Sequence, residues 1–251
     1  MQDDSALGRA TAMVADLRQR CDWDRIQTRQ TLRPYLIEEV HELDAAIAAN
    51  DAGAIRDEVG DLMLHLAWQL VLGAEAGEFT ASDIADDLVA KMRRRHPHLF
   101  DLGPADAWQA LKRRERSAGT GTLDGLPATL PALALAYRLQ ERAAGVGFDW
   151  PDTDGPADKV REELAEVEVE LKSQTPNGVD ARAEEIGDLL FAVVNLARKA
   201  HVHPDAALER ANRKFQRRFE QVEQLAATRG IEMSGAGLDV LDQLWDEVKR
   251  Q

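Results

Sequence analysis

The chain has 251 residues, of which 44% are hydrophobic, so it can bury the core of one large or two ordinary domains and is not a disordered chain. Its formal net charge of −14 comes from 31 lysines and arginines against 45 aspartates and glutamates. A surface this acidic repels phosphate backbones and anionic membranes, which excludes polymeric nucleic acid and membranes as expected partners.

The sequence begins with an acidic stretch that has no hydrophobic signal segment, and its single cysteine, Cys21, cannot form an intrachain disulfide. Both features predict a cytoplasmic protein. From there on, apolar residues recur at helical spacing, and no segment shows the alternation that is typical of a strand. Helices in the first half are expected over residues 5–20, 32–49, 52–76, 82–96 and 105–116.

A stretch rich in glycine, proline and threonine separates the two halves and is the predicted linker, residues 119–131. The second half repeats the order of the first, with helices expected over residues 132–144, 157–172, 180–200, 204–228 and 238–250. We therefore expect an all-α protein made of two tandem four-helix units, with domains at residues 1–118 and 132–251.

Each half carries the same acidic pattern, Glu-Glu-x-x-Glu on one predicted helix and Glu-x-x-Asp on the next. The carboxylates are Glu162, Glu163, Glu166, Glu185 and Asp188 in the second half, and Glu38, Glu39, Glu42, Glu58 and Asp61 in the first. Residues three and four apart share one face of a helix, so two antiparallel helices would bring these carboxylates together. Such a cluster repels itself unless a cation binds, and an all-oxygen set suits Mg²⁺, with Mn²⁺ as a substitute.

A lysine and an arginine follow four residues apart on a later helix of each half, as Lys91 and Arg95 and as Lys214 and Arg218. One helical turn separates the members of each pair, so they can neutralise neighbouring phosphates. Together with Mg²⁺ held by carboxylates, they predict a site for a triphosphate that needs no glycine-rich phosphate loop. A carboxylate that the metal does not use would accept the proton of an attacking water.

On these features the chain resembles the MazG family, nucleoside triphosphate pyrophosphohydrolases of all-α fold. The resemblance covers nearly the whole chain and also includes RRHPHLF at 94–100, LPALALAYRLQERAAGVGFDW at 130–150, EEIGDLLFAVVNLAR at 184–198 and ANRKFQRRF at 211–219. It implies Mg²⁺-dependent hydrolysis of (d)NTP to (d)NMP and pyrophosphate, with metal-activated water attacking the α-phosphorus. It also implies a homodimer in which each helical unit is completed by its partner.

The same resemblance implies roles for single residues of the second half. The implied metal ligands are Glu163, Glu166, Glu185 and Asp188. The candidate substrate-binding residues are Lys159, Glu162, Arg182, Asn195, Lys214, Arg218 and Trp245. Arg182 is the basic residue nearest to a position that is lysine in the family. The candidate catalytic residues are Glu162, Glu163, Lys214 and Arg218.

The two halves are not expected to contribute equally. Both keep five acidic residues, but only the second has Asn195 and the full ANRKFQRRF segment. We therefore predict that the second half carries most of the turnover and that the first mainly stabilises assembly. Two alternatives stay open at this point. One is a non-catalytic helical regulator of the stress response that binds nucleotide, and the other is a di-iron bundle suggested by Glu38-x-x-His41, for which Ala165 stands where a second histidine is needed.

Overall fold

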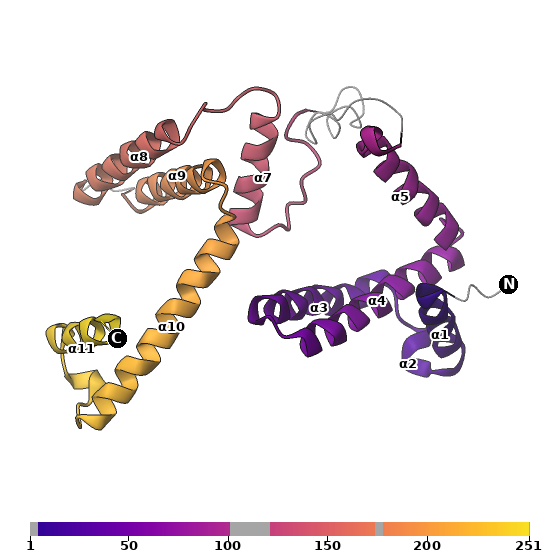
Figure 1. The fold of residues 1–251 in the computed structure, drawn as a ribbon, viewed down its shortest axis with the longest axis horizontal. Coiled ribbons are helices and arrows are strands. Elements are labelled where there is room, and N and C mark those ends of the chain that lie inside the picture. Colours follow the sequence, from indigo (N-terminus) through magenta and orange to yellow (C-terminus); the bar gives the residue numbers. More distant parts are fainter. Residues whose placement is uncertain (1–4, 101–120, 174–177, 251) are drawn as a thin grey trace. The chain divides into compact units, whose positions relative to one another are not determined.

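The computed structural model describes residues 5–100, 121–173 and 178–250, and all the regular elements in these ranges are helices, which confirms the all-α fold. The chain divides into two compact units, Met1–Asp106 and Ala107–Gln251 (Figure 1). The expected helix at 105–116 and the start of the expected linker lie outside the described residues, so the domain boundaries stay a prediction. Among the described helices, none is long and apolar enough to cross a membrane.

The first unit is organised around a long helical hairpin (Figure 1). Its described helices are α1 (Ala6–Arg20), α2 (Asp22–Arg25), α3 (Arg29–Ala49), α4 (Ala52–Glu75) and α5 (Ala81–Arg95), followed by the 3-10 turn η1 (Pro97–Leu99). Helices α1 and α3 each pack against α4. The buried core lies where these three helices meet and consists of Val14, Leu32, Ala67, Trp68 and Val71.

The turn between α3 and α4 sets the register of the two acidic patterns in this unit. Asn50 ends α3 in the left-handed conformation, with φ 55°, a conformation that asparagine tolerates better than most residues. Asp51 then starts α4, because its side chain accepts hydrogen bonds from the backbone N–H groups of Gly53 and Ala54. A turn this short makes the chain double back, so that the Glu-Glu-x-x-Glu face of α3 lies against the Glu-x-x-Asp face of α4.

The second unit repeats this arrangement. Its described helices are α7 (Ala132–Ala144), α8 (Asp154–Lys172), α9 (Gly178–Lys199), α10 (Pro204–Thr228) and α11 (Leu238–Arg250), with the 3-10 turn η2 (Met233–Gly235) before the last. Helices α8 and α9 form the hairpin that corresponds to α3 and α4, and α7 packs against α9 as α1 packs against α4. Helices α10 and α11 pack on each other around a separate apolar cluster of Val222, Ala226, Leu244 and Val248.

Candidate functional site

Three carboxylates of the second unit lie together at the α8–α9 hairpin. Glu163 comes from α8, and Glu185 and Asp188 come from α9; one oxygen of each lies within 4.8 Å of the others. Glu163 is only 4% exposed, whereas Glu185 is half-buried and Asp188 is exposed. The set therefore has one oxygen ligand embedded in the protein and two facing the surface.

The electrostatics of this cluster favour a bound cation. Partial burial raises the pKa of Glu185, and the negative charges of Glu166, Asp188 and Glu163 raise it further. Glu166 therefore acts on the cluster through its charge, although it is not among the three carboxylates that converge. Carboxylates that raise one another's pKa in this way are relieved by a divalent cation, and oxygen donors are the ligands that Mg²⁺ and Mn²⁺ prefer. The residues present thus fit the expected metal.

Lys159, one turn before the acidic pattern on α8, makes the closest cationic contact with the cluster among the described residues. Its Nζ lies 2.5 Å from Glu163 Oε1 and 2.8 Å from Glu162 Oε1. These two carboxylates raise the pKa of Lys159 well above its usual range, so the lysine stays charged at neutral pH. The structure thus places Lys159 and Glu162, both predicted to contact substrate, next to the carboxylates.

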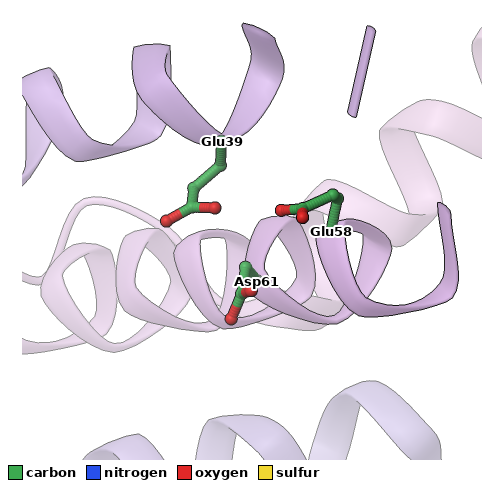
Figure 2. Close-up of side chains that lie close together, drawn as sticks. All are labelled: Glu39, Glu58 and Asp61. Atoms are coloured by element: carbon green, nitrogen blue, oxygen red, sulfur yellow. The ribbon is translucent and has the colours of Figure 1, made fainter. Parts of the chain in front are cut away.

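The first unit holds a matching cluster, in which Glu39 on α3 faces Glu58 and Asp61 on α4 (Figure 2). Partial burial is the largest cause that raises the pKa of both Glu39 and Glu58; among neighbouring charges, Asp61 contributes most for Glu39 and Glu42 for Glu58. Glu38 also raises the pKa of Glu39. No lysine stands at the position that corresponds to Lys159 in the second unit, because the residue three before the first glutamate of the pattern is the exposed Tyr35.

A pocket of about 530 Å³ adjoins the carboxylates of the second unit. Its lining includes Lys159, Glu163 and Asp188 together with Gln140, Phe148, Trp150, Phe191, Asn195 and Arg198. The predicted substrate-binding residue Asn195 is 8% exposed, and its side-chain oxygen accepts hydrogen bonds from Arg198 at 3.0 and 2.7 Å. Apolar and aromatic lining with a few convergent polar groups is the usual composition of a small-molecule site.

At two of the pocket positions the first unit has apolar residues instead of polar ones. When the two Glu-x-x-Asp patterns are aligned, Trp68 stands at the position of Asn195 and Val71 at the position of Arg198. Trp68 is 3% exposed and belongs to the core of its unit. The described pocket of this unit is lined by residues of α1, α2, α4 and the start of α5, and none of the three carboxylates contributes to its lining.

Several predicted site residues do not line the described pocket of their unit, and their contact with substrate stays a prediction. Lys214, Arg218 and Trp245 are absent from the lining of the second unit's pocket, and so is Arg182. Trp245 packs beside the α10–α11 cluster, with its ring centroid 5.3 Å from that of Phe215. For the first unit, the described pocket lining likewise contains neither Lys91 nor Arg95.

Comparison with known proteins fits this geometry. The MazG nucleotide pyrophosphohydrolase domain matches residues 27–100, which include Glu39, Glu58 and Asp61. The chain is 41% identical to the nucleoside triphosphate pyrophosphohydrolase of Escherichia coli K12, over 92% of this chain and 91% of that protein. The chain belongs to the MazG family. It is also 38% identical to the nucleoside triphosphate pyrophosphohydrolase/pyrophosphatase MazG of Thermotoga maritima, over 91% of this chain and 89% of that one.

Three polar residues of the MazG chain's second unit were not singled out from the sequence, although they shape the pocket. Arg198 pairs with Asp149 at 2.5 Å, and the pKa of Asp149 is lowered mainly by hydrogen bonds from Arg198 and less by Lys199. Gln140 is buried and lines the pocket. A signal for Asp149 was present, since Asp-Trp follows the lead helix in each half of the sequence. For Gln140 no such signal exists.

Proposed function

We propose that the second unit of this MazG chain hydrolyses nucleoside triphosphates to the monophosphate and pyrophosphate, with a divalent metal held by Glu163, Glu185 and Asp188. The observation that carries the proposal is the convergence of these three carboxylates beside a pocket large enough for a nucleoside. We take the metal to be Mg²⁺, with Mn²⁺ as a substitute, because the donor set consists of oxygen alone. Cys21 is a free thiol, which suits the cytoplasm where we place this activity.

The bound metal would supply charge neutralisation at the phosphate oxygens and a lower pKa for a coordinated water. The protein's own groups supply the rest. Lys159 is held beside Glu163 by its ion pair, in position to contact a phosphate oxygen. Glu162 is exposed and would accept a proton from the attacking water. The water oxygen bonds to the α-phosphorus, the bond from that phosphorus to the bridging oxygen breaks, and pyrophosphate leaves.

We further propose that the active form is a homodimer and that Lys214, Arg218 and Trp245 reach the substrate from the partner subunit. Supporting this, both hairpins leave equivalent apolar residues uncovered. Val59 and Leu66 on α4 are 45% and 58% exposed, and Ile186 and Val193, at the same positions of the acidic pattern on α9, are 43% and 45% exposed. A second copy of the chain would bury these stripes.

The activity is tested by incubating the chain with a nucleoside triphosphate and Mg²⁺ and measuring both phosphate products. We expect pyrophosphate and nucleoside monophosphate in equal amounts, and loss of both when the metal is chelated. Release of orthophosphate would indicate attack at the terminal phosphate instead. Tight binding of the nucleotide with no product would favour a non-catalytic regulator.

The assignment to the second unit is tested by a matched pair of variants. Glu163→Gln removes a carboxylate from the second cluster, and Glu39→Gln removes its counterpart from the first. We expect pyrophosphate release to fall by about a hundredfold or more in the first variant and to change little in the second. If the Glu39 variant loses activity and the Glu163 variant keeps it, the roles of the two units are reversed.

A further inference from the structure

The side-chain amide of Gln140 on α7 is buried, and only its nitrogen forms a hydrogen bond. The residue is 7% exposed and lines the pocket next to the carboxylates. Its Nε2 donates a hydrogen bond to the backbone carbonyl of Phe191 at 2.8 Å, and this bond fixes which way round the amide lies. Its Oε1 is buried and has no hydrogen-bond partner among the described residues. A buried acceptor without a donor destabilises the free protein and is satisfied when a ligand supplies an N–H or O–H group.

The first unit shows what a purely structural glutamine looks like in this fold. Gln27 is equally buried, at 6% exposed. Its Nε2 donates to the backbone carbonyl of Trp23 at 2.9 Å, and its Oε1 accepts from the hydroxyl of Thr31 at 2.7 Å. Both ends of that amide are used within the protein. Gln27 thus shows that a glutamine buried to the same degree can have both ends paired within the protein, which Gln140 does not.

Asn195 offers the complementary group to the same pocket. Its side-chain oxygen is occupied by Arg198, so its amide N–H groups are what it can present to a ligand. Phe148 and Trp150 add aromatic rings to the lining. Beside its charged residues, the pocket therefore offers a neutral acceptor, a neutral donor and aromatic rings, which suits a flat heterocycle that carries an N–H group next to a hydrogen-bond acceptor.

We propose that this pocket binds the nucleobase of the substrate, with Gln140 Oε1 accepting a hydrogen bond from an N–H group of the base. The assignment rests on the proposed function, since Glu163, Asp188 and Lys159 of the same lining would hold the phosphate end. Adenine, guanine, cytosine and uracil all carry an N–H donor beside an acceptor. The pocket therefore favours bases that carry this pair of groups and does not distinguish strictly among the four.

The test compares two ligands that differ in a single group. AMP carries a 6-amino group on its base, and purine riboside 5′-monophosphate has a hydrogen atom in its place. Neither can be hydrolysed to pyrophosphate, so their dissociation constants can be measured calorimetrically with Mg²⁺ whether or not the protein turns over triphosphates. We expect the wild-type protein to bind AMP about tenfold more tightly, because loss of the amino group leaves Oε1 unpaired.

The variant Gln140→Met removes the acceptor at similar volume and should bind the two ligands equally. The matched control Gln27→Met removes an equally buried glutamine of the first unit and should keep the wild-type preference. Equal binding by the wild-type protein, failure of AMP to bind, or a preference that survives in Gln140→Met would each overturn the nucleobase assignment. Pyrophosphate release is measured separately, so its absence would count against the proposed hydrolysis and not against the base contact.

Discussion

The side-chain amine of Lys159 lies beside the same carboxylates that would hold the metal. Its Nζ contacts an oxygen of Glu163, whose carboxylate is one of the proposed metal ligands. Two cations close to one carboxylate oppose each other's binding. A nucleotide would relieve this opposition, because its phosphate oxygens can accept Lys159 while the metal takes the carboxylates. We therefore expect the ion pair to link metal binding to nucleotide binding.

Substitution Lys159→Met should consequently have opposite effects on the two ligands. Without nucleotide, we expect the affinity for Mg²⁺ to rise about two- to fivefold, since Lys159 is partly exposed and its competing charge is partly screened. Pyrophosphate release should fall about tenfold or more, since the phosphate loses a charged hydrogen bond. Metal titration by calorimetry and steady-state assays measure the two effects.

Arg161→Met is the matched control for Lys159→Met. Arg161 lies on the same helix but pairs with Asp158, and both side chains are largely exposed. Neither metal affinity nor turnover should change in this variant. A Lys159→Met variant with weaker metal binding would contradict the competition.

At the residue scale, a site residue could be predicted from the sequence when its position depends on nearby residues of the chain, and not when it depends on a distant one. Glu163, Glu185 and Asp188 were predictable because helical spacing and one turn determine where they point. Gln140 was not, since its burial depends on α7 packing against α9, and its hydrogen-bond partner Phe191 lies 51 residues away in the chain. Lys214 and Arg218 were predicted from their spacing and from the family, and Trp245 from the family alone; their contact with substrate stays a prediction.

Among the elements, a charged clamp connects the segment between α7 and α8 to the end of α9. Arg198 donates to both carboxylate oxygens of Asp149, at 3.2 and 2.5 Å, and Lys199 donates to the same carboxylate at 3.3 Å. Arg198 also donates to Asn195, so the clamp holds the oxygen of that amide. The clamp therefore attaches the segment of Phe148 and Trp150, which both line the pocket, to the end of α9.

Asp149→Asn should destabilise the second unit by about 2 kcal/mol at neutral pH, because it removes the charge from a mostly buried, bidentate pair. The hydrogen bonds of Arg198 hold the folded-state pKa of Asp149 below its ordinary value of 3.8. The stabilisation is therefore fully present above the ordinary value and is lost as pH falls through the folded one. The difference in urea unfolding free energy between wild type and variant should thus be constant from neutral pH down to about pH 5 and shrink below about pH 4.

Asp158→Asn serves as the control for the clamp, since its partner Arg161 is exposed. We expect no measurable change in stability at any pH for this variant. A stability difference for Asp149→Asn that grows as the solution becomes more acidic would have the wrong sign for a carboxylate with a lowered pKa.

The sequence predicted where most helices lie better than it predicted the residues at which they begin. Helices α7, α10 and α11 begin and end at the expected residues. Helix α3 was expected from residue 32 but begins at Arg29, because Thr28 and Thr31 form a capping box with a threonine at the position where glutamate or glutamine is usual. The short helix α2 (Asp22–Arg25) was not expected, since four residues are too few for periodicity to show.

For the molecule as a whole, the two hairpins carry the same acidic groups in different surroundings. The first unit uses Trp68 and Val71 to complete its core. The second places Asn195 and Arg198 at those positions and keeps a pocket. The two units thus differ in the polarity of these positions, which are apolar in the first unit and polar in the second. Both retain exposed apolar stripes on the hairpin, so both have surface to contribute to assembly.

The proposed homodimer can be tested through the separation of its functional groups. Glu163→Gln inactivates the carboxylate cluster but leaves α10 intact, and the double variant Lys214→Ala, Arg218→Ala does the reverse. If the partner supplies α10, each variant alone is inactive. Equal amounts dissociated and reassembled together then give half mixed dimers, each with one complete site, and recover about one quarter of the wild-type activity. No recovery, with mixed dimers demonstrated by mass, would show that each site is completed within one chain.

The mass of the assembly tests the dimer directly. Light scattering of the wild-type protein should give about twice the chain mass of 27.8 kDa. The double variant Ile186→Asp, Val193→Asp should reduce this mass to that of one chain, because two charges then lie in the buried stripe.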